Sequence, residues 1–308
     1  MKIALTGGSG FIGTRLIADL EKDGHDIKII DIAHDDPLDI CDKDKLIQAC
    51  EGCDIIYHLA AEHADNIQPI EKYYAVNGEG TQNVVAAAMA NNIQKIIFTS
   101  TVAVYPMNSN HADETISPAP FNHYGKSKLE AEEHLQKWAA ASPTHQLTIV
   151  RPCVVFGEGN RGNVYNLMRQ IASGKFLMIG EGDNRKSMAY VGNVAAFLKF
   201  CMSLNENYAI YNYADKPDYK AKDLVSKIYQ ALGKAKPKLY LPYSLGIWIG
   251  SAFDMLGKAT GRIFPISQIR IKKFCAETTV NADKAHEVFT PVYTLEEGVQ
   301  RMINHDFK

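Results

Sequence analysis

Tyr124 and Lys128 are the two side chains best suited, by type and spacing, to acid–base chemistry. A separation of four residues places two side chains on one face of a helix. A free phenol has a pKa near ~10, and acid–base work at neutral pH needs a value about three units lower. A neighbouring ammonium favours the phenolate. Because the same spacing is typical of any exposed helix face, the pair needs support from other residues.

Hydroxyl groups end a predicted buried strand, Lys95–Ser100, and Thr101 follows it directly. The carboxyl ends of parallel strands form the edge of a sheet at which ligands bind. A Thr or Ser hydroxyl at that edge can orient a substrate oxygen beside a tyrosine. We therefore predict that a hydroxyl at this strand end lies beside the acid–base pair of Tyr124 and Lys128.

A glycine-rich turn follows the first predicted strand, Lys2–Thr6, with glycines at Gly7, Gly10 and Gly13. A tight strand-to-helix turn needs residues that are free to take positive φ, and a pyrophosphate must reach backbone N–H groups without meeting a Cβ. The helix predicted from 11 to 22 then directs the positive end of its dipole at the phosphates. The turn therefore indicates a dinucleotide-binding site.

Asp31 ends the second predicted strand, Asp26–Asp31, 18 residues after Gly13. A carboxylate at this place accepts hydrogen bonds from the ribose hydroxyls of the adenosine half and repels a 2′-phosphate. No Arg or Lys follows it directly. The sequence therefore predicts NAD as the cofactor rather than NADP.

Strand-like apolar runs alternate with helical segments through the first half of the chain, which is typical of βαβ units and a parallel sheet. The remaining predicted elements of this half are strands at 54–59, 95–100 and 146–150 and helices at 70–91, interrupted near Asn77 and Gly78, and at 123–141. We predict an α/β fold, a doubly wound parallel Rossmann sheet with a smaller, discontinuous C-terminal substrate lobe. The dinucleotide-binding domain is expected at 1–156 and about 188–215, and the substrate-binding lobe at about 157–187 and 216–308.

Composition is that of an ordinary globular protein: the 308 residues are 46% hydrophobic and 22% charged, with a net charge of −2. No basic excess indicates a nucleic-acid partner. The start of the chain lacks an apolar targeting segment, so we expect a cytoplasmic protein with reduced cysteines. Cys50 and Cys53 have C-x-x-C spacing, but no second ligand pair accompanies them, and we expect a structural role and no metal.

The stretch 239–256 is apolar but contains Pro242, Gly246, Gly250 and Asp254, so no membrane span is predicted. A buried or groove-lining helix is one interpretation of this stretch, and contact with a membrane surface is the other.

These motifs occur in the order found in the extended short-chain dehydrogenase/reductases, and the chain resembles their NAD-dependent epimerase/dehydratase superfamily, which includes UDP-galactose 4-epimerase-like enzymes. Further residues that carry the resemblance are Asp39-Ile40, His58-Leu59-Ala60-Ala61, Asn77 with Gly80-Thr81, and Thr101 with Tyr105. The resemblance covers about half of the chain strongly. It extends more loosely to Arg151-Pro152, to Arg185 with Tyr190-Val191, and to 294–303.

The resemblance implies roles for these residues. The pyrophosphate is held by Gly7, Gly10, Phe11, Ile12 and Gly13. The adenosine ribose is held by Asp31, and Asp39 and Ile40 lie against the adenine. Leu59, Ala60 and Ala61 pass under the cofactor, and Asn77, Tyr124 and Lys128 lie at its nicotinamide half. The implied catalytic set is Thr101, Tyr124 and Lys128, in which Thr101 and Tyr124 contact the reacting hydroxyl or ketone of the substrate. Relatives also pair as homodimers through the helices that correspond to 80–92 and 123–141. There Ala86, Ala87, Ala88 and Ala90 on one helix and Leu135 and Trp138 on the other are the expected contacts.

Departures from the family pattern bear on the reaction. Sugar-nucleotide dehydratases place Asp and Glu after the catalytic Thr, whereas Val102 and Ala103 follow Thr101 and carry no proton. Many nucleotide-sugar enzymes have Asn where this chain has Val154, which brings the segment nearer to hydroxysteroid and flavonol reductases. In the other direction, the loop around Arg185 resembles the phosphate-side loop of polysaccharide biosynthesis enzymes, and a guanidinium there can bind a diphosphate.

We therefore expect an NAD-dependent oxidoreductase or isomerase of nucleotide sugars. An epimerase that abstracts and returns one hydride through a keto intermediate ranks first, because Asp31 suits a cofactor that stays bound. A reductase of a 4-keto nucleotide sugar, or of a hydroxysteroid- or flavonol-type ketone, is the alternative. A non-catalytic dinucleotide sensor ranks lower, since it needs no Thr–Tyr–Lys set.

Overall fold

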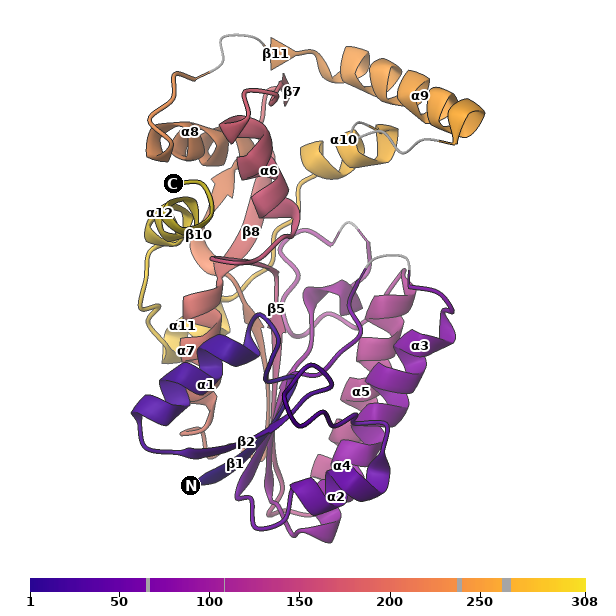
Figure 1. The fold of residues 1–308 in the computed structure, drawn as a ribbon, viewed down its shortest axis with the longest axis vertical. Coiled ribbons are helices and arrows are strands. Elements are labelled where there is room, and N and C mark those ends of the chain that lie inside the picture. Colours follow the sequence, from indigo (N-terminus) through magenta and orange to yellow (C-terminus); the bar gives the residue numbers. More distant parts are fainter. Residues whose placement is uncertain (65–66, 108, 237–239, 262–266) are drawn as a thin grey trace. The chain divides into compact units, whose positions relative to one another are not determined.

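The computed structural model describes residues 1–64, 67–107, 109–236, 240–261 and 267–308 (Figure 1). The chain divides into two compact units. The first contains Met1–Val155, Ala189–Asp215 and Val280–Tyr293, and the second contains Phe156–Met188, Lys216–Thr279 and Thr294–Lys308. Residues 280–293, which the sequence places in the lobe, thus belong to the first unit.

A six-stranded parallel sheet forms the centre of the first unit, in the order β2-β1-β3-β4-β5-β9. Its strands are β1 (Lys2–Thr6), β2 (Asp26–Ile30), β3 (Ile55–His58), β4 (Lys95–Thr99), β5 (Gln146–Pro152) and β9 (Tyr208–Tyr213). The strand order reverses between β1 and β3, and ligands bind outside the carboxyl ends of strands at such a switch point. The predicted doubly wound Rossmann sheet is confirmed.

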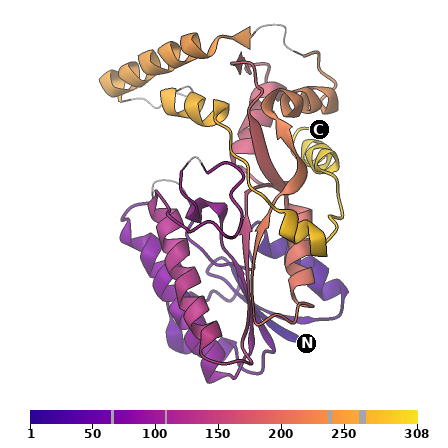
Figure 2. The same ribbon diagram turned by 180° about the vertical axis from the view of Figure 1, so that it is seen from behind.

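Helices cover both faces of this sheet, as Figures 1 and 2 show. On one face, α1 (Gly13–Lys22) packs against α7 (Val191–Cys201), with Leu16 and Phe197 in the core. On the other, α4 (Gly80–Ala90) lies between α2 (Lys43–Ala49) and α5 (His123–Ala140), around a core that contains Val84 and Leu135. The helix α11 (Asp283–Val288) also belongs to this unit.

The interruption predicted near Asn77 and Gly78 is a π-helical turn. It spans Ala75–Glu79 between α3 (Glu71–Tyr74) and α4, and it buries both residues. A π-turn inserts an extra residue into a helix and is frequent at functional sites. Here it turns the Asn77 side chain into the interior of the unit.

The second unit contains a two-stranded sheet, five helices and most of two strands of a three-stranded sheet, within the described residues; two of the three residues of the third strand, β6 (Val154–Phe156), belong to the first unit. The strands of the three-stranded sheet, in the order β10-β8-β6, are Asp215–Lys220, Arg185–Tyr190 and Val154–Phe156, and β11 (Tyr240–Leu241) pairs with β7 (Met178–Ile179). The helices are α6 (Asn163–Ala172), α8 (Ala221–Ala231), α9 (Tyr243–Thr260), α10 (Gln268–Cys275) and α12 (Leu295–Asp306). Thr294 and Glu297 form a capping box at α12.

The apolar stretch 239–256 falls mainly on β11 and α9, and residue 239 lies outside the described residues. Across the ranges that the structure describes, every helix is too short or too polar to cross a bilayer.

Candidate active site

The glycine-rich turn after β1 admits no larger residue at two of its positions. Gly7 has a φ of +75°, and a Cβ placed on it would lie 2.5 Å from the backbone nitrogen of Ala60. A Cβ on Gly13 would lie 2.3 Å from the carbonyl oxygen of Gly7. Helix α1 begins at Gly13, two residues later than predicted, and Ile12 supplies no side-chain cap. A tight glycine turn that leads into a helix N-terminus fits the pyrophosphate of a dinucleotide.

Asp31 joins the carboxyl end of β2 to this turn. Its carboxylate accepts hydrogen bonds from the backbone N–H of Ser9 at 3.0 Å and of Ala33 at 2.8 Å. The acid is half-buried and is followed by exposed Asp35 and Asp36 rather than by a cation. The local charge is thus unfavourable to a 2′-phosphate.

The other residues expected near the cofactor lie along the same edge of the sheet. Ile40 is buried, and a Cβ on Gly80 would lie 2.7 Å from its Cδ1, so Ile40 packs directly on the start of α4. Asp39 is exposed and accepts a hydrogen bond from the N–H of Cys41. Leu59, Ala60 and Ala61 follow β3 and are half-buried.

A chain of hydrogen bonds links the end of β1 to the start of α4. Thr6 Oγ1 lies 2.7 Å from His58 Nδ1, and His58 Nε2 lies 2.9 Å from Thr81 Oγ1. The Thr81 hydroxyl donates to the carbonyl oxygen of Asn77 at 2.5 Å. Burial, with a smaller contribution from Lys128, lowers the pKa of His58 to about 3, so its ring is neutral at neutral pH.

Asn77 continues this chain to the catalytic helix. Its amide donates to Ser127 Oγ at 2.9 Å, and the Ser127 hydroxyl donates to the carbonyl oxygen of Tyr124 at 2.9 Å. The amide also makes two hydrogen bonds with the backbone of Glu62, at 2.8 and 3.0 Å. Asn77 therefore fixes the first turn of α5. The sequence motif contains Asn77, but it indicates nothing of Ser127.

Thr101 and Tyr124 meet because α5 approaches the short 3₁₀ helix η2 (Val102–Val104) closely. A Cβ on Gly125 would lie 2.3 Å from the carbonyl oxygen of Ala103, so a glycine is required beside the tyrosine. Asn122 caps α5 through the N–H of Gly125 at 2.7 Å. The Tyr124 hydroxyl is hydrogen-bonded to the Thr101 side chain, a contact that the sequence analysis did not predict.

Burial raises the pKa of Tyr124, and the hydrogen bond from Thr101 opposes that rise. The direction is the reverse of the lowering expected from the four-residue spacing. The reason is the position of Lys128: its Nζ donates to the carbonyl oxygen of Thr99 at 2.8 Å and lies 4.1 Å from the centre of the Phe98 ring. Any lowering of the Tyr124 pKa therefore has to come from a positively charged ligand near the phenol.

Lys128 is buried, and burial lowers its pKa to about 7 although Glu132 favours the charged form. An ammonium that titrates at neutral pH is an unusual group and typical of active sites. The catalytic set predicted from sequence is thus brought to one place in the first unit: Thr101 meets Tyr124, and Lys128 lies on the same helix.

Behind Lys128 lies a buried ion pair that the sequence analysis missed. Both Glu132 carboxylate oxygens accept from Arg151, at 2.9 Å from Nε and 2.5 Å from Nη2, and Ser100 Oγ donates to Glu132 Oε1 at 2.5 Å. Arg151 Nη1 also donates to the Tyr105 hydroxyl at 2.9 Å. One signal was available, because Glu132 follows Lys128 by four residues and so shares its buried helix face.

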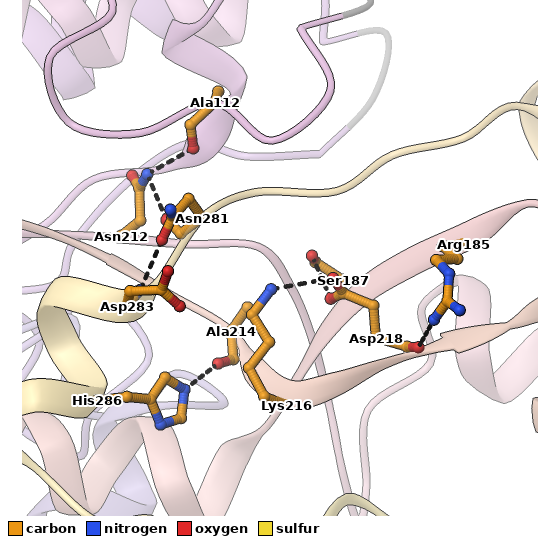
Figure 3. A network of polar contacts seen from close by, with 10 residues as sticks. All are labelled: Ala112, Arg185, Ser187, Asn212, Ala214, Lys216, Asp218, Asn281, Asp283 and His286. Carbon is orange, nitrogen blue, oxygen red and sulfur yellow. Dashed lines mark hydrogen bonds and ion pairs between the residues drawn. The ribbon is translucent and has the colours of Figure 1, made fainter.

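Asn212 extends this network to the end of the sheet. The Tyr105 hydroxyl donates to Asn212 Oδ1 at 2.8 Å, and the Asn212 amide donates to the carbonyl oxygens of Ala112 and Asn281, each at 3.0 Å (Figure 3). Residue 281 thereby ties the 280–293 segment to the first unit. Neighbouring His286 hydrogen-bonds the carbonyl oxygen of Ala214 at 2.8 Å.

Arg185, the residue predicted to bind a substrate diphosphate, lies in the second unit at the start of β8. It is exposed, and its Nη1 donates to the carbonyl oxygen of Asp218 at 3.1 Å. The Asp218 carboxylate in turn accepts from Ser187 at 2.6 Å and from Lys216 at 3.0 Å (Figure 3).

The cysteines are free thiols. Cys50 and Cys53 are buried, and burial raises the pKa of Cys50 to about 12, so the C-x-x-C pair is held as unreactive thiols. Within the described ranges, no group of three or more His, Cys, Asp or Glu side chains is arranged to hold a metal ion.

Comparisons with known proteins agree with this site. Residues 3–214 match the profile of the NAD dependent epimerase/dehydratase family. The chain is 47% identical over 99% of its length, and 95% of the relative's, to an N-acetyl-alpha-D-glucosaminyl-diphospho-ditrans,octacis-undecaprenol 4-epimerase of Escherichia coli O157:H7. It is 27% identical to a UDP-glucose 4-epimerase of Vibrio cholerae, covering 97% of this chain and 93% of that one.

Solved structures share the fold at lower identity. A UDP-N-acetylglucosamine 4-epimerase from Bacillus cereus aligns with a TM-score of 0.78 at 20% identity and covers 99% of both chains. A UDP-glucuronic acid 4-epimerase from the same organism, solved in complex with NAD, aligns with a TM-score of 0.76 at 21% identity, covering 99% of this chain and 98% of that chain. The chain therefore belongs to the NAD dependent epimerase/dehydratase family and is an NAD-dependent enzyme of the extended short-chain dehydrogenase/reductase type.

Proposed function

We propose that this enzyme inverts the C4 hydroxyl of an N-acetylhexosamine that is linked through a diphosphate to a polyprenol. The observation that carries this proposal is the identity of 47%, along nearly the whole chain, to a relative named for that reaction. The sequence analysis predicts a nucleotide sugar instead. Both substrates present a sugar on a diphosphate, and they differ in what the diphosphate carries. Val154, where many nucleotide-sugar enzymes have Asn, fits a substrate without a nucleotide.

The cofactor site proposed for NAD consists of the glycine-rich turn after β1, the carboxylate of Asp31 and the residues along the carboxyl edge of the parallel sheet. NAD, when bound, supplies the acceptor for a hydride from C4 and returns it. The residues assigned to holding it are Gly7, Gly10, Phe11, Ile12, Gly13, Asp31, Asp39, Ile40, Leu59, Ala60, Ala61, Asn77, Tyr124 and Lys128. The support is geometric, since a Cβ at Gly7 or Gly13 would clash with backbone atoms, so only glycine allows the tight turn that a pyrophosphate-binding site uses.

Tyr124 is the proposed acid–base residue. As a phenolate, its oxygen would take the proton of the sugar 4-hydroxyl as the hydride leaves C4. The resulting phenol would return that proton to the ketone oxygen when the hydride comes back to the opposite face of C4. Thr101, hydrogen-bonded to Tyr124, holds the same oxygen during both half-reactions. Lys128 holds its ammonium on the carbonyl oxygen of Thr99, so the positive charge that favours the phenolate is proposed to come from the nicotinamide of bound NAD. Dehydration is not proposed, because Val102 and Ala103 carry no proton.

Arg185 is the residue that we propose for the diphosphate of the substrate. The support is its exposed guanidinium, anchored by one N–H on Asp218, which leaves a planar fork suited to phosphate oxygens.

We also propose a homodimer, formed through the outer faces of α4 and α5. The alanine and aromatic contacts predicted from sequence are wrong in part, because Ala87, Ala88, Leu135 and Trp138 are buried in the core of the first unit. That core needs them, since α4 packs between α2 and α5. Of the predicted contacts, Ala90 is exposed and Ala86 is half-buried. Other exposed residues of these helices include Gln82 and Met89 on α4 and Lys126, Glu133 and Lys137 on α5; Met89 is 68% exposed.

The proposed reaction is tested with purified enzyme and a polyprenyl diphosphate-linked N-acetylglucosamine, without added cofactor, followed by release and separation of the two epimeric sugars. Interconversion supports the proposal. Stoichiometric consumption of NADH or NADPH on a 4-keto sugar, without interconversion, would assign the chain to the reductases instead.

A further inference from the structure

The outward face of α9 in the second unit is apolar. Leu245, Trp248, Ala252, Met255 and Leu256 are all exposed, and their spacing aligns them in one stripe along the helix. Trp248 is 75% exposed and Met255 is 73% exposed. A contiguous exposed apolar patch of this kind marks an interaction surface.

The inward face of α9 explains why the stripe stays outside. A Cβ on Gly246 would lie 2.6 Å from the Ile179 side chain, and one on Gly250 would lie 2.8 Å from the backbone nitrogen of Gln268. Asp254 accepts a hydrogen bond from that same nitrogen at 3.0 Å. The helix is therefore seated on its neighbours by its small and polar residues. Other large apolar side chains of α9, among them Ile247 and Phe253, are half-buried, whereas those of the stripe are left exposed.

Positive charge accompanies the stripe. Helix α10 packs along α9, as Figures 1 and 2 show, and carries exposed Arg270, Lys272 and Lys273 but no Asp or Glu. Ile269 on the same helix is 59% exposed. Tyr240 and Tyr243 add exposed rings at the beginning of α9. An apolar stripe with tryptophan and tyrosine, bordered by cations, has the composition of a helix that lies in the interface of an anionic bilayer.

We propose that α9 and α10 dock this enzyme on the surface of a bilayer containing anionic phospholipids. The stripe enters the boundary between headgroups and acyl chains, and the α10 cations contact the headgroups. The proposal rests on the proposed function, because a polyprenol-linked sugar resides in a bilayer and an enzyme that acts on it gains from being held there. The helix lies on the membrane and does not span it.

The two tryptophans of the chain provide a direct test. Trp138 is 3% exposed and Trp248 is 75% exposed, so only Trp248 is placed to meet lipid. Vesicles of phosphatidylglycerol and brominated phosphatidylcholine should quench the fluorescence of the wild-type chain and shift it to the blue. The variant Trp248→Phe, which keeps only the buried tryptophan, should show little quenching. Equal quenching in both proteins, or none in either, would overturn the proposal.

Sedimentation with unbrominated vesicles tests the stripe as a whole. The double variant Trp248→Glu/Met255→Glu should bind the vesicles at least about tenfold more weakly than the wild type, because two charges enter the apolar face. The matched control is Val292→Glu, at an apolar position of the first unit that is 61% exposed, which should bind as the wild type does. Binding of the wild type should also weaken with added salt. Unchanged vesicle binding by the double variant would contradict the proposal. Dimers of the wild type that form without vesicles, and that are lost in the double variant but not in Val292→Glu, would also contradict it. That second result would assign the stripe to contact with a second copy of the chain.

Activity measurements separate this inference from the proposed function. The double variant should epimerise a short-chain, water-soluble polyprenyl diphosphate sugar at the wild-type rate and turn over a long-chain substrate in vesicles more slowly. Vesicle binding without turnover of either substrate would refute the proposed function and leave the membrane surface standing. Equal turnover of the vesicle substrate by the wild type and the double variant, with no vesicle binding by either, would refute the membrane surface and leave the proposed function standing.

Discussion

Lys128 donates from Nζ to the carbonyl oxygen of Thr99 at 2.8 Å, which anchors the only lysine of the catalytic set at the carboxyl end of β4. Thr101 lies two residues further along, hydrogen-bonded to Tyr124. The lysine is thus fixed by the strand that carries the threonine, rather than by contact with the phenol. Its charge then depends on burial, which lowers its pKa to about 7.

This pKa predicts a dependence of stability on pH. In the folded chain Lys128 loses its proton near pH 7, and in the unfolded chain near its ordinary value of 10.5. Between these values the unfolded chain binds more protons, so the free energy of unfolding rises with pH, by about 1 kcal/mol per pH unit. Lys128→Met should lack this rise in the free energy of unfolding between pH 7 and pH 8, as measured by urea unfolding at the two pH values. The control, Lys126→Met, changes an exposed lysine of the same helix and should keep the wild-type slope.

Glu132→Gln should destabilise the first unit strongly. The substitution keeps the shape of the side chain but leaves the buried Arg151 guanidinium without its counter-charge, at a cost of about 3–5 kcal/mol. Glu133→Gln, the exposed neighbour, should change stability by less than about 0.5 kcal/mol. Urea unfolding of the two variants side by side measures the difference. Similar stability in both would mean that the ion pair contributes little.

Asp31→Ala should reduce the preference for NADH over NADPH. The carboxylate accepts from Ser9 and is placed to accept from a ribose, and loss of hydrogen bonds to a charged group costs about 1.5–3 kcal/mol. NADH affinity should fall and NADPH affinity should fall less, as measured by fluorescence titration. Asp35→Ala removes an exposed carboxylate nearby and should leave NADH affinity unchanged. Tighter NADPH than NADH binding by the wild type would contradict the role of Asp31.

Met89→Glu should dissociate the proposed homodimer at micromolar concentration, because it places a charge at the most exposed apolar side chain of α4. Light scattering coupled to gel filtration gives the mass. Val292→Glu, which adds the same charge away from α4 and α5, should remain dimeric. A wild-type mass of one chain would remove the basis for this interface.

The elements that the sequence predicted well are those whose backbone tolerates few residue types. The turn at Gly7 and Gly13 requires glycine for steric reasons, and these reasons can be read from spacing alone. The parallel sheet follows from apolar runs alternating with amphipathic helices. Asn77 and the Thr101–Tyr124 pair came from the motif order, and the structure brings that pair together.

Features that depend on long-range packing could not be predicted in this way. The spacing of Glu132 from Lys128 indicates a shared helix face, but it does not show that the carboxylate is buried, because that burial depends on Arg151, 19 residues away. The alanines of α4 are compatible with an interface or a core, and only the packing against α2 and α5 shows that Ala87 and Ala88 are core. Residues 280–293 join the first unit through Asn212, which no local pattern indicates.

The central claim is that one hydride leaves C4 and returns to it with inversion, and Tyr124 moves the accompanying proton. The most direct measurement uses a polyprenyl diphosphate-linked N-acetylglucosamine deuterated at C4, incubated with purified enzyme without added cofactor. The account predicts the 4-epimer with deuterium retained at C4, formed about 10²–10⁴-fold more slowly by Tyr124→Phe. No epimer, an epimer that has lost its deuterium to solvent, or a Tyr124→Phe variant within tenfold of the wild-type rate would contradict it.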